Sequence, residues 1–264
     1  MNKKAVYLSN KEYEKIFINF CSLRQKVIEH LKNFGILKSK YIMDLLAGHG
    51  FLSFALREAN YDKHLIDIGL RNDLDSFKKT IAKGQFNFKN VQYNIMDSSK
   101  LGFRNECINF IINFLGFEDV NMTKGKFGVI STLSEIVRVL QKGGFLEIAI
   151  LIKNSEPSSI LFWQIWKYIG LNSIFYPPKF YIHQLRKLNC SLEAKFLLKT
   201  YKKMNFEQAK EEILFACEEA PKIFKNFDVT SKSFQEVWDK FGANIKKYGL
   251  GFYPDILVLI FKRY

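Results

Sequence analysis

Tyr41-Ile-Met-Asp-Leu-Leu-Ala-Gly-His-Gly50 is the stretch of sequence that decides the fold. It begins as a short apolar run of strand length, and two glycines, Gly48 and Gly50, separate it from a helical stretch over residues 51–59. A helix that starts directly after a buried strand presents free backbone N–H groups and the positive end of its dipole, which favour a negatively charged ligand. Glycine lets a ligand approach the backbone closely. The stretch predicts a strand–loop–helix ligand site, although glycine turns also end many strands that bind nothing.

Strands and helices alternate along the following hundred residues. Apolar runs of strand length occupy residues 64–68, 91–95, 108–113 and 145–151, and helical stretches over 73–83 and 133–140 fall between some of them. Before the glycine loop, apolar residues at helical spacing between Tyr13 and Leu31 predict an amphipathic helix. Strands that alternate with helices indicate an α/β fold with a parallel sheet covered on both faces.

The last third of the chain has a different pattern. Residues 192–198 predict a strand with one partly polar face, and residues 255–262 predict an apolar, interior strand. Between them lie two apolar stripes at helical spacing, the second of which follows a capping box formed by Ser233 and Glu236. We therefore expect a helical insertion over residues 205–248.

Acidic residues follow the second and third predicted strands. Asp67 lies seventeen residues after Gly50, where a carboxylate can accept hydrogen bonds from ribose hydroxyls. Asp97 follows the third strand, and Glu135-Ile-Val-Arg-Val-Leu-Gln-Lys-Gly-Gly144 precedes the fifth. The order and spacing of these segments carry more information than the glycine loop alone.

In this order the segments resemble the class I S-adenosylmethionine-dependent methyltransferases, particularly the subgroup that includes the ubiquinone and menaquinone C-methyltransferases and many small-molecule enzymes. Residues 44–50 match the family motif D-x-G-x-G-x-G except at its first glycine, which is Leu46 here. Residues 100–109 are similar to the segment that leads into strand four, and residues 135–144 resemble E-x-x-R-V-L-K-P-G-G, with Lys142 in place of proline. The resemblance covers residues 35–152.

The resemblance implies a Rossmann-like, mixed seven-stranded sheet with strand order 3-2-1-4-5-7-6 and an antiparallel seventh strand. Residues 1–264 would form a single domain, with an N-terminal helical region (1–40), a cofactor-binding half (41–152) and an acceptor-side half (153–264). The implied cofactor is S-adenosylmethionine, and S-adenosylhomocysteine is its product. Asp67 would bind the ribose and Asp97 the adenine amino group. The complete set of expected cofactor-binding residues is Asp44, Ala47, Gly48, Gly50, Asp67, Ile68, Met96, Asp97 and Asn113.

A nicotinamide cofactor is the rival interpretation of the glycine loop. It requires G-x-G-x-x-G, and the third glycine position holds Ser53. It also leaves Asp97 and the pair Gly143-Gly144 unexplained. We therefore favour S-adenosylmethionine.

Composition limits the setting in which the protein acts. The chain has no apolar stretch of membrane-spanning length and no signal-peptide pattern, so we expect a soluble, cytoplasmic protein. Its four cysteines are widely spaced, which indicates free, buried thiols and no metal site. The net charge of +14 comes from 33 Lys and only 7 Arg. Because arginine is the preferred ligand for phosphate, nucleic acid is a possible but not a favoured partner.

The acceptor side carries weaker signals. The sequence contains neither an N-P-P-Y motif after strand four nor a catalytic signature that we can identify, and we favour a small-molecule acceptor over RNA, protein or a non-catalytic role. Exposed lysines gathered on one face would support RNA or protein (Lys195, Lys199, Lys202, Lys203 and Lys210). Our hypothesis for Arg24 is that it binds the cofactor's carboxylate. We expect the N-terminal helix and the insertion to form a lid over the acceptor pocket. A dimer contact is the competing role of the insertion. Other candidates for the acceptor side are Tyr176, Tyr181, His183, Trp163 and Trp166, of which the two tryptophans fit a hydrophobic core better. We interpret Glu118-Asp119 as part of a solvated loop. We interpret His49 as a packing residue.

Overall fold

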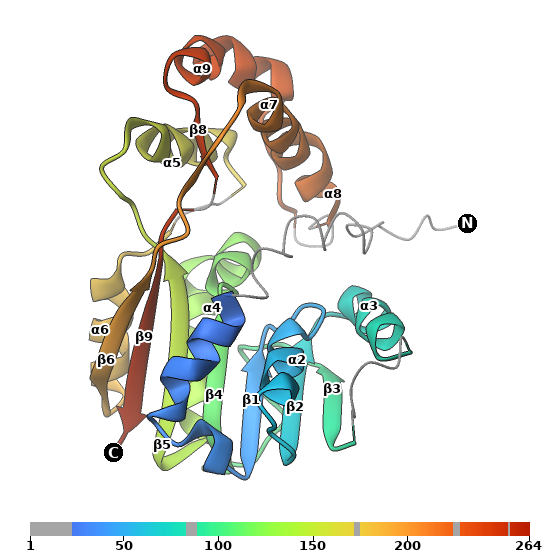
Figure 1. The fold of residues 1–264 in the computed structure, drawn as a ribbon, viewed down its shortest axis with the longest axis vertical. Coiled ribbons are helices and arrows are strands. Elements are labelled where there is room, and N and C mark those ends of the chain that lie inside the picture. The colour runs from blue at the N-terminus through green and yellow to red at the C-terminus, as the bar shows by residue number, and fades with distance from the viewer. Residues whose placement is uncertain (1–22, 83–88, 172–174, 224–227, 253) are drawn as a thin grey trace.

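Seven strands form one mixed sheet in the order β3-β2-β1-β4-β5-β9-β6 (Figure 1). The computed structural model describes residues 23–82, 89–171, 175–223, 228–252 and 254–264. The first five strands are parallel, and β9 runs antiparallel to both of its neighbours. The predicted order 3-2-1-4-5-7-6 is confirmed, with β9 as the seventh strand of the sheet. The strands are β1 (Tyr41–Leu45), β2 (His64–Gly69), β3 (Val91–Ile95), β4 (Ile108–Phe114), β5 (Leu140–Leu151), β6 (Cys190–Leu198) and β9 (Ile256–Arg263).

Helices cover both faces of the sheet, as the near-continuous apolar strands require. Helical residues 23–32 and α2 (Phe51–Glu58) pack on one face, around Val27, Leu31 and Leu56. Two further helices, α4 (Phe117–Val139) and α6 (Pro178–Lys187), pack on the other face (Figure 1). The helix α3 (Arg71–Ala82) follows β2. The 3₁₀ turn Ile36–Lys38 leads into β1.

The strand β6 lies at the edge of the sheet, and its side chains alternate as predicted. Glu193, Lys195 and Leu197 are exposed, whereas the intervening residues are half-buried or buried. Charged side chains on an edge strand discourage pairing with another chain. The interior strand β9 is apolar and almost entirely buried.

A third hydrophobic core holds together the insertion that separates β6 from β9. It joins α5 (Pro157–Ile169) to α7 (Phe206–Leu214) and α9 (Phe234–Tyr248), above the sheet in Figure 1. The predicted capping box of Ser233 and Glu236 begins α9. A π-helical turn (Phe215–Glu219) and α8 (Ala220–Ile223) follow α7. Two strands that we did not predict, β7 (Lys202–Met204) and β8 (Leu250–Phe252), pair at its base; three residues are too few to show a periodic pattern.

Three predictions of local structure need correction. The helix expected at 133–140 begins at Phe117, because it continues across a kink at Gly125, whose φ of 64° and ψ of −167° suit only glycine. Glu118 and Asp119 consequently lie in the first turn of α4, not in a solvated loop. Strand β5 begins at Leu140, five residues earlier than predicted. The predicted N-terminal helix is present over residues 23–32, and its earlier part lies outside the described residues.

The structure describes three of the four cysteines. Cys190 and Cys217 are buried and Cys107 is half-buried, and all three are free thiols; Cys21 lies outside the described residues. Among the described helices, none is both long enough and apolar enough to cross a membrane. The same part of the chain contains no group of side chains arranged to hold a metal ion.

Glu147, fully buried in β5, gives a test of this packing. Its Oε2 accepts a hydrogen bond from the Asn113 N–H at 3.1 Å, and its Oε1 has no hydrogen-bond partner among the described residues. Burial raises the pKa of Glu147 well above its ordinary value of 4.5. The folded state therefore keeps a proton that the unfolded chain releases, and stability from this residue is lost as pH rises above 4.5.

We expect Glu147→Gln to retain the hydrogen bond and to remove this dependence on pH. The variant should exceed the wild type in free energy of unfolding by about 1–3 kcal/mol at about pH 8, and by less near pH 5. Urea unfolding at the two pH values measures both differences. A constant difference across this range would contradict the assignment of a buried, protonated carboxyl.

Candidate functional site

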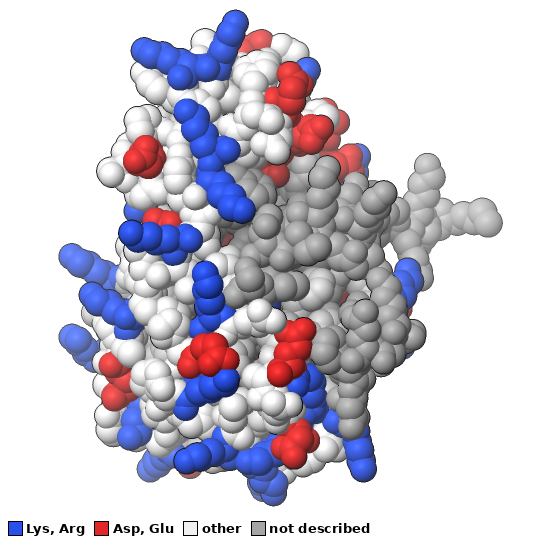
Figure 2. All heavy atoms as spheres, in the orientation of Figure 1, with Lys and Arg blue, Asp and Glu red and all other residues white. Residues whose placement is uncertain are grey.

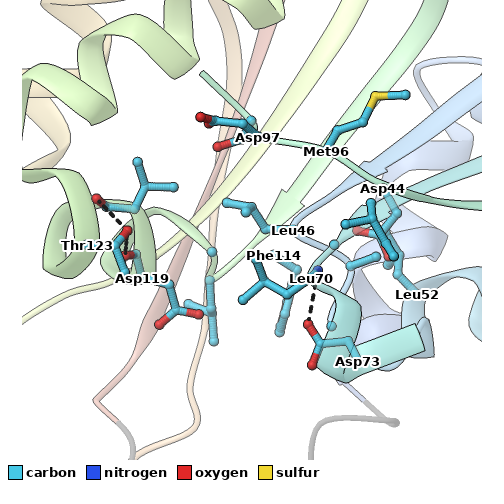
Figure 3. Close-up of a pocket in the computed structure, with 18 of the residues that line it drawn as sticks. Asp44, Leu46, Leu52, Leu70, Asp73, Met96, Asp97, Phe114, Asp119 and Thr123 are labelled. Carbon is cyan, nitrogen blue, oxygen red and sulfur yellow. Dashed lines mark hydrogen bonds between the residues drawn. The ribbon is translucent and has the colours of Figure 1, made fainter. Parts of the chain in front are cut away.

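A cavity of about 380 Å³ lies beyond the carboxyl ends of the parallel strands (Figure 3). Five of the nine predicted cofactor residues line it, namely Asp44, Ala47, Gly48, Met96 and Asp97. Asp44 and Met96 occupy one side in Figure 3, and Asp119 with Thr123 from α4 occupies the other. This position is the usual ligand site of an open α/β sheet.

The most deeply buried charge in the cavity wall is Asp44, at the end of the central strand β1. Only 3% of the residue is exposed, and the loss of water raises its pKa to about 7, while the positive charge of Arg24 acts in the opposite direction. The guanidinium of Arg24 is itself buried and lies over the rings of Phe51 and Phe114, at 5.1 and 5.3 Å from the ring centres. Arg24 also lines the cavity, as the hypothesis about the N-terminal helix requires.

Three of the residues between β1 and α2 adopt left-handed backbone conformations. Gly48 and Gly50 have φ values of 54° and 77°, and Leu46, at the position of the missing glycine, has a φ of 63°. A left-handed conformation costs a side-chain-bearing residue about 1–2 kcal/mol. Leu46 lines the cavity and packs on Gly116, where a Cβ would lie only 2.6 Å from the Cβ of Leu46. Gly116, between β4 and α4, thus leaves room for the leucine that replaces the first glycine of the motif.

Asp97 is held in its ionised form at the edge of the cavity. Its Oδ1 accepts hydrogen bonds from the Ser99 N–H (2.9 Å) and Oγ (2.7 Å), and its Oδ2 forms an ion pair with Lys124 of α4. Partial burial opposes ionisation, but these hydrogen bonds prevail and lower the pKa of Asp97. The carboxylate remains about half exposed, with a side-chain exposure of 47%, so it can accept a further donor.

The other four predicted cofactor residues do not line the cavity. Ile68 is a core residue whose carbonyl accepts the Ala47 N–H at 2.8 Å. Asn113 is buried, and its Nδ2 donates to the Leu45 carbonyl at 2.8 Å, which ties β4 to β1. Gly50 caps α2.

Asp67 lies behind the glycine loop and is fully buried. Its Oδ1 accepts a hydrogen bond from Ser53 Oγ at 2.5 Å. Desolvation, reinforced by the negative charge of Asp44, raises its pKa well above 3.8. In this conformation the side chain expected to bind ribose is therefore separated from the cavity.

His49 is a packing residue of the glycine loop, as expected. It is 2% exposed, and burial together with the charge of Arg24 lowers its pKa to about 4. The imidazole is consequently neutral near pH 7 and lies 3.9 Å from a carboxylate oxygen of Asp73. It does not line the cavity.

The acceptor-side candidates have mostly structural roles. Tyr181 and Trp163 are core residues, and Trp166 packs partly buried in the third core. Tyr176 donates a hydrogen bond to Asn121 Oδ1 at 2.9 Å and stacks on Phe180. His183 is exposed on α6. None of these five side chains lines the cavity.

Sequence reasoning missed the contribution of α4 to the cavity. Asp119, Val120, Thr123 and Lys124 line it from the first two turns of that helix. The carboxyl of Asp119 is exposed to the cavity, yet the surrounding protein limits its solvation and Asp73 adds a negative charge, so its pKa is raised. The acidic pair after strand four was the available signal, and it was assigned to a loop.

The lid expected from the N-terminal helix and the insertion stays a prediction. Arg24 of the N-terminal helix reaches the cavity, whereas no described residue of the insertion lines it. The five lysines considered for RNA or protein binding are all exposed, on β6, β7, α7 and the β6–β7 connection. Figure 2 shows Lys and Arg spread over both lobes of the visible face, with Asp and Glu among them.

By sequence, neither a known protein family nor a curated protein matches the chain. By structure, the chain has the Rossmann-like fold of methyltransferases. A protein of Bacillus halodurans provisionally described as a methyltransferase is 16% identical, with a TM-score of 0.59 over 84% of this chain and 92% of that chain. Magnesium protoporphyrin IX methyltransferase of Synechocystis, determined with bound S-adenosylhomocysteine, is 12% identical, with a TM-score of 0.59 over 98% and 90%. The [4+2]-cyclase SpnF is 14% identical, with a TM-score of 0.53 over 84% and 74%.

The contact between Leu46 and Gly116 predicts compensating substitutions. Gly116→Ala should destabilise the protein by about 1–3 kcal/mol, because the new methyl group overlaps Leu46. Leu46→Gly removes this overlap and the left-handed strain, whereas a second overlap, with Asn113 Nδ2 at 2.7 Å, remains, so the double variant should regain part of that loss. Urea unfolding of the four proteins measures the coupling energy, and strictly additive effects would rule out the contact.

Proposed function

We propose that this chain is an S-adenosylmethionine-dependent methyltransferase that acts on a small-molecule acceptor. The observation that carries the proposal is the cavity at the carboxyl ends of β1 and β3, where Asp44, Gly48, Met96 and Asp97 meet as the motif order requires. Fold alone does not define a reaction, and the geometry of these side chains provides the argument.

The residues present fit this cofactor. Asp44 is a buried carboxylate under the influence of the positive charge of Arg24, so it offers a partner for the amino group of a methionine moiety. Arg24 in the same wall offers a partner for the carboxylate of that moiety. Asp97 has acceptor capacity for an exocyclic amine, and Ile95, Met96 and Leu70 provide apolar surface for a purine ring.

The bound cofactor supplies an activated methyl group on a sulfonium, so the protein contributes mainly by position. Phe114, Leu115 and Leu46 line the cavity with apolar surface, which disfavours water beside a bound methyl group. Holding the acceptor there in line with the methyl group is worth up to roughly 7–11 kcal/mol in favourable intramolecular reactions.

Asp119 is the side chain of this chain best placed to accept a proton from an acceptor. It faces the cavity, and the raised pKa makes it a stronger base than an ordinary aspartate.

The cavity volume of about 380 Å³ suits a small ligand. The open cavity gives less support to a non-catalytic role.

Cofactor binding tests the proposal through Asp44. We expect calorimetric titration to show binding of S-adenosylmethionine and S-adenosylhomocysteine, and Asp44→Asn to lower both affinities by about tenfold or more through loss of a charge-assisted hydrogen bond. Asp239→Asn, which changes an exposed aspartate on α9, is the matched control and should leave both affinities unchanged.

The same titration has an expected dependence on pH. Because the pKa of Asp44 is raised to about 7, the carboxyl must ionise to bind an ammonium group, so affinity should increase between about pH 6 and 7.5. The increase should be absent in Asp44→Asn. Failure of the folded wild type to bind either compound over this range would refute the proposed function.

A further inference from the structure

Tyr93 lies directly beside Asp67 on the neighbouring strand. The two residues are in register between β2 and β3, so their side chains emerge on the same face of the sheet. The side chain of Tyr93 passes over Gly69, where a Cβ would lie only 2.0 Å from its hydroxyl oxygen. The hydroxyl donates a hydrogen bond to the carbonyl of Gly48 at 2.7 Å. Tyr93 thus spans the opening between the end of β2 and the glycine loop.

Phe77 of α3 completes this cover. Its ring lies 4.8 Å from that of Tyr93, measured between centroids. It also occupies the side-chain space of Gly50, since a Cβ there would lie 2.5 Å from the Phe77 ring. Two glycines therefore leave room for two aromatic rings, and both rings lie at the edge of the glycine loop.

Behind the rings, one oxygen of Asp67 has no hydrogen-bond partner among the described residues. Asp67 is fully buried; Ser53 satisfies Oδ1, while Oδ2 is the unpaired atom and lies 3.1 Å from the Cβ position of Gly50. An unsatisfied buried oxygen costs about 1–3 kcal/mol. The arrangement therefore points to a ligand with hydroxyl donors that reaches Asp67 past the glycine loop.

We propose that Tyr93 is a gate over a diol-binding subsite at Asp67, and that its hydrogen bond to Gly48 holds the subsite closed in the free protein. The ligand class is a ribose with free vicinal hydroxyls, and the inference rests on the proposed function. Tyr93 can move because it is only partly buried and β3 is the edge strand of the sheet. The closed form competes with the cofactor, which reduces apparent affinity by the fraction of molecules that are open.

Rapid-mixing measurement of S-adenosylhomocysteine binding tests the gate. Tyr93→Phe removes the hydroxyl that donates to Gly48 and keeps the ring. The open fraction should therefore increase about three- to tenfold, and with it the association constant, which is the ratio of the measured association and dissociation rate constants. Asp67→Asn should weaken binding in both the wild-type and the Tyr93→Phe backgrounds. Tyr201→Phe is the matched control, because it removes a tyrosine hydroxyl that contacts Ser158 of α5, and neither residue lines the cavity.

The possible outcomes separate the two claims. Binding by the wild type with an unchanged or weaker association constant in Tyr93→Phe overturns the gate and leaves the proposed function intact. Equal strengthening by Tyr201→Phe also overturns it, because the effect would not depend on Gly48. Absence of binding by wild type, Tyr93→Phe and Tyr201→Phe alike overturns the proposed function together with the gate.

Discussion

The site depends on one constraint: a carboxyl group, that of Asp44, is buried away from water at the end of the central strand. Asp44 lies on β1 between β2 and β4, where burial raises its pKa to about 7 although the charge of Arg24 lowers it. Arg24 brings the compensating positive charge from the N-terminal helix, and that cation is in turn enclosed by Phe51 and Phe114. Arg24, twenty residues earlier in the sequence, thus links the N-terminal helix to this strand end, and both residues line the cavity together with α4.

The same region concentrates strain and unsatisfied polar groups. Leu46 and Leu115, at the ends of β1 and β4, both have left-handed φ values and both line the cavity. Asp67 keeps one oxygen unpaired within the described part of the chain. Strain and unpaired polar groups are unfavourable for folding, and they commonly mark ligand sites. The strained and unpaired groups therefore lie together at the proposed binding site, where they lower the stability of the folded protein.

The sequence was sufficient to predict the sheet and the glycine loop because both follow from local patterns. Continuous apolar runs identified the interior strands, and Gly48 with Gly50 identified the turn. The relation of Asp67 to the cavity was not predictable, because it depends on Phe77 and Tyr93, which lie ten and 26 residues away in the chain and meet only in the fold. The first turns of α4 were missed for a related reason: Gly125 breaks the helical periodicity within the helix. The short strands β7 and β8 offered no period to detect.

Hydrogen–deuterium exchange with and without saturating S-adenosylhomocysteine tests most directly whether this cavity is the cofactor site. The account predicts slower exchange in three separate segments, residues 44–53, 95–99 and 113–124, and unchanged exchange in the insertion over 205–248. Protection confined to the insertion, or exchange unchanged by the compound throughout the chain, would contradict it.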